Sequence, residues 1–464
     1  MGGLFSALQN ASTALGVFSQ ALGVDQSNVA NASTPGYAAQ RATISPIDLS
    51  GDGTSDDFVT VSSSGNAFTD ATVRAASSQA SESQTQASLL SPVNQLFDIT
   101  GSTGILAAFQ QFSTAFSNLS ASPNDPTLGA AALSAAGNVA SAFQNVANNL
   151  ESQSTQLNTS VQSTTAQINT LAANISQLNV QRAASPQANP AAEANLRSDL
   201  DQLSSLVDIN VTTAPDGTVS VLAGGQLPLV LGDQSYTLSA NLSAAPGSQI
   251  SSSAGGNSPV AFSGQLGALL LTQNGTISPL LGANGQPGSL NTLAAGFASQ
   301  VNTLLSSGVT ASGAAGVPIF TYDTAANATD VAQTLTLDPS VTADQLGLAT
   351  TGANPQSNGV ANALAALPGS TANPIQGLSA EGFFGSIAAS VGQQLSDVNT
   401  ASTADQTTLT SAQAARQQQS GVSLDQEAAN ITAYQRSYEA NAQVVSILNQ
   451  LTQDVINMGT PSGG

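Results

Sequence analysis

The side chains that could carry chemistry in this 464-residue chain are almost entirely carboxylates. The chain has no histidine and no cysteine, which excludes an imidazole base, a thiol nucleophile, a zinc site and a disulfide framework. All six basic residues are arginine, so the lysine of a Walker-type phosphate loop is also missing. Carboxylate chemistry of the glycosidase kind stays open. Sugar-binding sites are usually rich in aromatic residues, however, and this chain has no tryptophan and only 4% aromatics. We therefore predict no enzymatic activity and no cofactor.

Three aspartates, Asp52, Asp56 and Asp57, lie close together in the sequence and suggest a calcium site. Their spacing does not fit a loop of the EF-hand type. A solvated acidic loop is the better interpretation, and no metal site is predicted.

The charge balance excludes two classes of partner. The chain carries 27 acidic residues against six arginines, for a net charge of -21. Such a chain cannot neutralise a run of phosphates or bind an anionic membrane surface, so neither nucleic acid nor membrane is expected as a partner. Only 7% of the residues are charged, which leaves a surface of Ser, Thr, Asn and Gln. That surface suits packing between copies of the chain, and it equally suits a secreted protein with a bland exterior.

Both ends of the chain carry the pattern of an amphipathic helix. At the N-terminus, apolar residues alternate steps of four and three over about five turns, and the helix is predicted to end near Gly23. At the C-terminus, from Gly421 to Met458, a second stripe faces a polar side formed by Asp425, Glu427, Asn430, Gln443 and Gln450. A single stripe is more often ordinary core than an interface. Because each stripe is too narrow to support a domain, we expect the two helices to pair with each other or with neighbouring copies.

Two short motifs carry a family resemblance. Ala30-Asn31 is followed by Thr34-Pro35-Gly36-Tyr37, in which Pro35 ends a helix and Gly36 permits a sharp turn. Near the other end, Gly421 to Ala428 reads GVSLDQEA, and Tyr434 to Ala440 reads YQRSYEA. Together the motifs resemble the terminal signatures of bacterial flagellar axial proteins, closest to the hook-associated members.

The sequence departs from the family at two places. The arginine usual after the Gly-Tyr pair is displaced to Arg41, and Gln426-Glu427 stands where two acidic residues are usual. The phrase LRSDLDQL from Leu196 to Leu203 also looks like the family. The resemblance covers both ends closely and the middle of the chain more loosely.

The resemblance implies a structural subunit that assembles through its terminal helices. Its implied partners are copies of itself in a helical assembly, the hook protein, the next hook-associated protein and an export chaperone on the C-terminal helix. The implied location is the extracellular flagellum, and MGGLFSALQN lacks the features of a cleaved secretory signal. The predicted assembly interface comprises Leu4, Leu8, Ala11, Leu15, Phe18, Leu22, Asn31, Pro35, Gly36, Tyr37, Leu424, Ile431, Tyr434, Tyr438, Val445, Leu448 and Val455.

The predicted fold class is a multidomain α+β protein. Terminal helices would form a coiled-coil-like region, a long helical rod would follow, and a mainly-β outer domain would be inserted. Short strands are expected over 38–75, and helices over 76–119, 130–182 and 381–419, with a stop and restart from Ser122 to Pro126. The helix over 130–182 has a heptad frame of nine apolar residues: Phe143, Val146, Leu150, Leu157, Val161, Ile168, Leu171, Ile175 and Leu178. A β-hairpin is expected from Ile209 to Val221, and one helix over 290–305 lies inside a strand-rich segment. Four domains are predicted. They are an N-terminal assembly helix and turn over 1–37, a long-helix rod domain over 38–206 that residues 375–420 complete, a mainly-β outer domain over 207–374, and returning helices with the C-terminal assembly helix over 375–464.

Two alternatives remain open at this point. The chain could be another axial protein, such as a hook or distal rod subunit, although its length and the motif from Gly421 to Ala428 argue against this. It could also be a secreted adhesin or glycan-binding protein whose activity lies in residues 207–370.

Overall fold

A computed structural model describes residues 2–48, 55–184, 189–242, 249–255, 261–324, 329–352 and 355–459. The chain divides into two compact units. Unit 1 consists of Met1–Ser78, Asn169–Tyr236 and Gln406–Gly464, and unit 2 of Gln79–Ile168 and Thr237–Asp405. The helices α2 (Ala67–Leu96), α4 (Pro126–Ala184) and α11 (Ala380–Ser420) contribute residues to both units.

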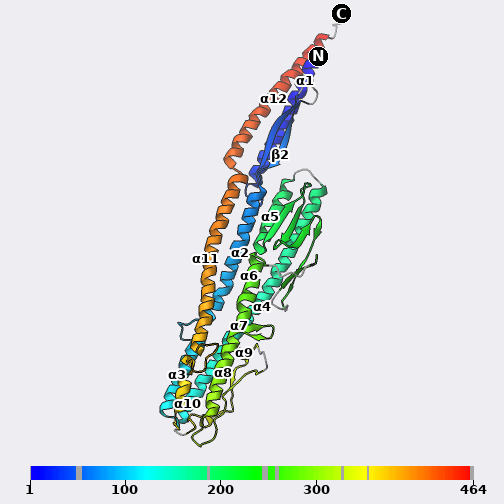
Figure 1. Cartoon of the computed structure of the whole chain (residues 1–464). Coiled ribbons are helices and arrows are strands. Elements are labelled where there is room, and N and C mark those ends of the chain that lie inside the picture. Colours follow the sequence, from blue (N-terminus) through cyan, green and yellow to red (C-terminus); the bar gives the residue numbers. More distant parts are fainter. Residues whose placement is uncertain are drawn as a thin grey trace. The chain divides into compact units, whose positions relative to one another are not determined.

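Unit 1 contains the two terminal helices, a long hairpin and a small sheet (Figure 1). Its other elements are α1 (Gly2–Asn31), β1 (Gln40–Asp48), β2 (Ser55–Ser63), α5 (Pro190–Leu206), β3 (Ile209–Thr213), β4 (Val219–Ala223), β5 (Leu227–Leu231), β6 (Gln234–Ser235) and α12 (Leu424–Gly459).

Helix α1 is longer than the sequence predicted. It runs through Gly23 and ends at Asn31, so the predicted end near Gly23 is wrong. A glycine inside a helix costs about 1 kcal/mol relative to alanine. Beyond Gly23, the side chains of Asp25 and Asn28 are buried, and their tertiary packing outweighs that local cost.

Strands β1 and β2 form an antiparallel hairpin that pairs Gln40 with Ser63 and Asp48 with Ser55. The strands predicted over 38–75 are present up to residue 63, but residues from Ala67 onward begin helix α2. The predicted acidic loop around Asp52 lies outside the described residues.

The four-stranded sheet has the order β3-β4-β5-β6, and the predicted hairpin of β3 and β4 is confirmed. Residues of β4 alternate between buried and half-buried positions, as expected of a strand with one covered face. Asn179 of α4 fixes the sheet. Its amide donates to the Val219 and Gly232 carbonyls at 2.7 Å each and accepts from the Val219 N–H at 2.9 Å.

Unit 2 is mainly helical. Besides parts of α2, α4 and α11, its helices are α3 (Gly104–Ala121), α6 (Gly264–Thr272), the π-helical turn η1 (Gln273–Ile277), α7 (Ser278–Leu281), α8 (Ser289–Ser307), α9 (Val331–Thr334), the 3₁₀ turn η2 (Ala343–Gln345), α10 (Gly359–Ala366) and the 3₁₀ turn η3 (Leu367–Gly369). Its strands pair two by two: β7 (Leu238–Asn241) with β8 (Gln249–Ser252), β9 (Gly282–Ala283) with β10 (Gln286–Pro287), and β11 (Phe320–Thr321) with β12 (Thr336–Leu337).

The longest helix, α4, starts where the sequence expects a restart. Pro126 occupies its first position, where a missing N–H costs no hydrogen bond, and the Asp125 carboxylate accepts from the Thr127 N–H at 2.8 Å. Six of the nine apolar positions of its predicted heptad frame are at most 1% exposed, which confirms the frame: Phe143, Leu150, Leu157, Val161, Ile168 and Ile175.

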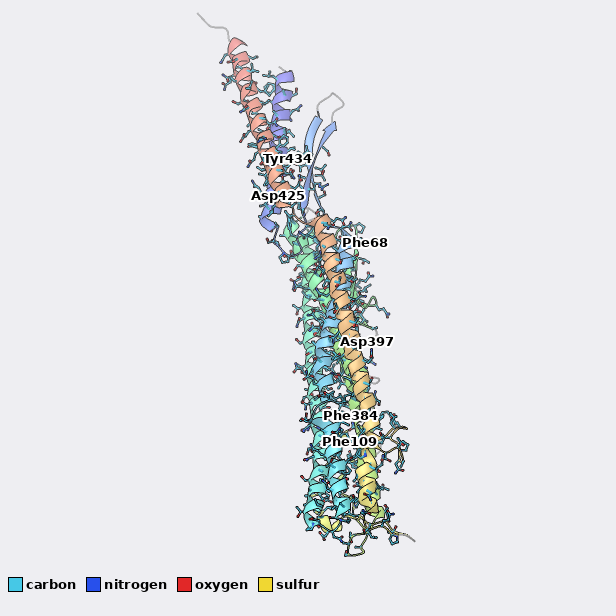
Figure 2. The ribbon with its side chains drawn as sticks, turned by 90° about the vertical axis from the view of Figure 1, so that its left-hand side faces the viewer. Phe68, Phe109, Phe384, Asp397, Asp425 and Tyr434 are labelled. Carbon is cyan, nitrogen blue, oxygen red and sulfur yellow. The ribbon has the colours of Figure 1, made fainter. Side chains whose placement is uncertain are left out.

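Phenylalanines form the centre of unit 2. The Phe109 ring of α3 lies 4.7 Å from that of Phe297 on α8 and 6.0 Å from that of Phe143 on α4, measured between ring centroids. A second pair joins Phe97 to Phe384 of α11 at 5.9 Å. Figure 2 labels Phe109 and Phe384 among the helices of this unit.

The predicted α+β class is confirmed. The helix predicted over 290–305 is α8, and the segment 207–374 also contains α6, α7, α9 and α10, which the sequence did not predict. These helices are short, and burial of their apolar faces in the folded unit stabilises them more than intrinsic propensity does. The domain boundaries derived from the sequence stay predictions.

Candidate assembly interface

Helices α1 and α12 lie side by side in unit 1 (Figure 1). The ring of Phe18 lies 6.3 Å from that of Tyr434, which Figure 2 labels on α12 beside α1. Asn28, ten residues further along α1, contacts Glu427, which precedes Tyr434 on α12. Because the residue order reverses between the two contacts, the helices are antiparallel.

The pairing brings together most of the predicted interface residues. On α1, Ala11 is buried, and on both helices a further set is half-buried: Leu4, Leu8, Leu15, Phe18, Leu22, Ile431, Tyr434, Val445 and Leu448. The structure thus gives the N-terminal seam the partner within the chain that the sequence suggested.

Three predicted residues of the C-terminal set are not in this pair. Leu424, Tyr438 and Val455 are exposed. Val455 lies beyond the first residue of α1, because the antiparallel register that places Phe18 beside Tyr434 leaves no residue of α1 opposite Val455.

A second apolar face therefore runs along α12. We call it the outer stripe, and it comprises Val444 (44% exposed), Ile447 (59%), Leu451 (46%) and Val455 (44%). The steps of three, four and four place these side chains on one side of the helix.

The turn after α1 carries the four other predicted residues. The Asn31 amide donates to the Ser27 carbonyl at 2.8 Å, and Pro35 is exposed. Gly36 has a φ of 74°, in the left-handed region that favours glycine. The Tyr37 hydroxyl donates to the Asn28 side-chain oxygen at 2.9 Å, which ties the turn back to the helix.

Asn28 is the centre of a buried polar cluster between α1, α12 and β1. Its amide donates to the Gln40 carbonyl at 2.8 Å and to a Glu427 carboxylate oxygen at 3.1 Å, while its oxygen accepts from the Gln40 N–H at 2.8 Å. Asn28 is fully buried and Glu427 is 7% exposed. The sequence placed Glu427 on the polar side of the helix, and this was wrong, because Asn28 offers a buried partner that no local pattern encodes.

Asp25, one turn before Asn28, is 4% exposed. Burial, a hydrogen bond with the Glu427 carboxyl and the negative charge of Glu427 together raise the pKa of Asp25 to about 7. The same surroundings raise the pKa of Tyr434, first through burial and then through the charges of Asp25 and Glu427. Two carboxyl groups thus meet where α1 packs against α12.

A second charged cluster holds the turn against α5. Arg197 donates from Nε to Asp70 at 3.0 Å and from Nη1 to the Gly36 carbonyl at 3.0 Å. A Cβ on Gly36 would lie 2.3 Å from the Ala194 carbonyl oxygen, so only glycine permits this approach. Arg416 of α11 completes the cluster with Asp201 at 2.6 Å.

Sequence reasoning missed Asp25, Asn28 and the ion pairs of Arg197 and Arg416. One signal was present: steps of three and four lead from Phe18 to Leu22 and then to Asp25, which continues the apolar seam. Ending the helix at Gly23 hid that continuation. No local signal joins Arg197 to Asp70, because the two are far apart in the sequence.

Within the described residues, no group of three or more acidic side chains is placed to hold a metal ion. No helix in the described ranges is long and apolar enough to cross a membrane.

Two family models match the chain, one in its middle part and one in its C-terminal helices. The model of the flagellar hook-associated protein FlgK helical domain matches residues 90–320, and that of the flagellar basal body rod FlgEFG protein C-terminal region matches residues 413–458. Together the two matches cover more than half of the chain. No curated protein matches the sequence significantly.

A solved structure shares the fold. The flagellar hook junction protein FlgK from Burkholderia pseudomallei aligns with a TM-score of 0.64 and 16% sequence identity. The alignment covers 76% of this chain and 100% of that one. With the terminal motifs, the paired terminal helices and the two family matches, the chain belongs to the family of flagellar hook-associated proteins.

Proposed function

We propose that this chain is a structural subunit of the bacterial flagellum at the junction between hook and filament, and that copies of it assemble through α1 and α12. The observation that carries the assembly mechanism is the outer stripe of α12. Its four apolar side chains are between 44% and 59% exposed although α1 packs along α12.

An exposed apolar stripe on a terminal helix favours association over an isolated copy. Each buried CH₂ group contributes about 0.8 kcal/mol, so covering these side chains in an assembly provides a substantial driving force. Few charges oppose the contact, since Asp454 is the one charged residue from Val444 to Val455. The proposed partners for this surface are neighbouring copies of the chain.

Other partners follow from the family. At a junction, the hook protein would lie on one side and the next hook-associated protein on the other. Before assembly, an export chaperone would cover the same outer stripe of α12 and keep it from aggregating. The proposed location is the extracellular flagellum.

We propose a role for each predicted domain in this assembly. Residues 1–37 and 375–464 would supply the assembly surfaces, 38–206 the long helical part, and 207–374 the outward-facing insert. The predicted interface residues that lie between α1 and α12 would hold a single subunit in its assembly-competent form, while the outer stripe would contact the next subunit.

The test is a pair of charge substitutions, Ile447→Asp and Leu451→Asp, in cells that lack the native copy. We expect cells with hooks but without filaments, seen by electron microscopy, together with loss of swimming. Gln450→Asp adds the same charge to the exposed polar side of the same helical turn and should leave filaments intact.

Circular dichroism of each purified variant separates a failure to fold from a failure to assemble. Normal filaments from folded Ile447→Asp and Leu451→Asp proteins would remove the outer stripe from the interface. A filament defect equal in the Gln450→Asp control would assign the loss to added charge in general, and would equally count against the stripe.

A further inference from the structure

The pair formed by Asp25 and Glu427 has no role in the proposed assembly surface. Both carboxyl groups are buried where α1 packs on α12, at 4% and 7% residue exposure. Ionised carboxylates only accept hydrogen bonds, so two of them side by side cannot bond to each other. The Oδ2 atom of Asp25 is buried and has no hydrogen-bond donor among the described residues.

Glu427 has a hydrogen-bond donor close by, unlike the Oδ2 atom of Asp25. One of its oxygens accepts from the Asn28 amide, which also donates to the Gln40 carbonyl. Two hydroxyl groups lie near the pair. The Tyr37 hydroxyl donates to Asn28 and not to either acid, and the Tyr434 pKa is raised by burial and by the charges of Asp25 and Glu427. A proton on Asp25 therefore supplies the missing donor, and it would let Asp25 bond to Glu427.

Among the described residues, no positively charged side chain takes the place of that proton. Arg436 on α12 and Arg41 on β1 are positively charged, but both are exposed. Asp425 on α12 is also exposed and is negatively charged. The described side chains of β2, Val59 to Ser63, carry no charge. Within the described part of the chain, neither Asp25 nor Glu427 forms an ion pair.

We propose that Asp25 and Glu427 share one proton across the α1–α12 contact, and that loss of this proton as the pH rises opens the contact. Closed, the pair is a neutral acid donating to a carboxylate. Deprotonated, it is two like charges in a buried position, which disfavours the closed state. The inference concerns one copy of the chain and does not depend on the proposed function.

The sign of the effect follows from the raised pKa. In the open state, Asp25 faces water and returns toward its ordinary pKa of 3.8, whereas in the closed state its pKa is about 7. The closed state therefore binds more protons between these two values. Its advantage is fully present below pH 3.8, falls as the pH rises through that window, and is lost above about pH 7. One linked proton changes the opening equilibrium about tenfold per pH unit inside the window.

Hydrogen–deuterium exchange of the purified full-length chain measures this opening. Peptides covering residues 15–30 and 424–440 are followed from pH 5 to pH 8.5, and each exchange rate is divided by its intrinsic rate at that pH. We expect the opening constant of the native chain to rise about tenfold per pH unit up to pH 7 and then level off.

Asp25→Asn is the decisive variant, because its amide donates to Glu427 at every pH. Its opening constant should stay at the acid value of the native chain over the whole range. Glu427→Gln removes the other negative charge of the pair. It provides the test of the shared proton if the Asp25→Asn substitution disturbs folding. The matched control is Asp425→Asn, which makes the same change on an exposed residue of α12 and should keep the native pH dependence.

Three results would overturn the proposal. A flat profile for the native chain shows that no proton is linked to the contact. A slope in Asp25→Asn and Glu427→Gln equal to the native slope assigns the linkage to other groups. Loss of the slope in Asp425→Asn as well shows an effect of net charge, which also rejects the shared proton.

Discussion

The phenylalanine centre of unit 2 and the α1–α12 pair of unit 1 are stabilised in opposite ways. In unit 2, Phe109, Phe112, Phe116, Phe143 and Phe297 are fully buried, and their rings contact one another across α3, α4 and α8. In the terminal pair, the larger apolar residues are only half-buried, and the buried positions hold alanines, one valine and a polar cluster.

From this difference we expect the terminal pair to depend on partners more than the phenylalanine centre does. Unit 2 encloses the phenylalanines of α3, α4 and α8 in a single copy. The terminal pair buries small side chains and leaves the outer stripe uncovered, so we expect it to open more easily than unit 2 in an isolated copy. Four substitutions test this contrast between the two regions.

Phe297→Ala should have the largest effect, because its ring lies between those of Phe109, Phe112 and Phe320. Removing a buried phenylalanine side chain costs about 3–5 kcal/mol of unfolding free energy. Urea unfolding followed by circular dichroism measures the loss. Phe68→Ala, at a side chain that is 77% exposed, is the control and should change little. Equal losses in the two variants would contradict the assignment of the core.

Arg197→Ala should come next. It removes the hydrogen bonds to Asp70 and to the Gly36 carbonyl and leaves a largely buried carboxylate with weaker partners. Losing hydrogen bonds to a charged group costs about 2–3 kcal/mol. Hydrogen exchange over residues 28–40 should become faster. Arg436→Ala, at an exposed arginine of α12, should leave these rates unchanged. Rates that stay unchanged in Arg197→Ala would show that the turn does not depend on this contact.

Gly36→Ala should destabilise the same turn by about 2 kcal/mol, since the new Cβ combines a left-handed backbone with a collision at the Ala194 carbonyl. Gly225→Ala is a matched control with a φ of 67° and open space around the new Cβ, so it should show the smaller, purely conformational cost. Chemical denaturation compares the two. If both variants lose the same stability, the close approach to α5 has no energetic importance.

Leu451→Asp should have the smallest effect on an isolated copy. Surface substitutions away from special features change unfolding free energy by about 0.5 kcal/mol or less. Leu448→Asp, one turn earlier and half-buried against α1, should speed hydrogen exchange of both terminal helices while leaving unit 2 protected. Similar exchange in the two variants would remove the distinction between the inner and outer faces of α12.

Much of the fold could be predicted from periodicity and turn chemistry. The seam from Leu4 to Leu22, the heptad frame of α4, the hairpin of β3 and β4 and the turn at Pro35-Gly36 all rest on local spacing. Local spacing specifies which face of an element is apolar, and it did so here at both ends of the chain.

The short helices α6 and α10 illustrate the limit of that reasoning. Their sequences, GQLGALLLT and GVANALAA, are too short to show a clear helical period. Their apolar residues, such as Leu266 and Leu364, are fully buried in unit 2. Burial, which depends on the whole unit, therefore selected a conformation that propensity alone left undecided.

Residue spacing was enough to show that the two terminal helices are amphipathic, that each needs a partner, and that a sharp turn follows the first. The folded chain was needed to show that α1 continues to Asn31, that Glu427 is buried, and that Arg197 donates to Asp70 and the Gly36 carbonyl. The physical reason is that a buried polar group needs a partner. In these clusters the decisive partners come from segments far apart in the sequence.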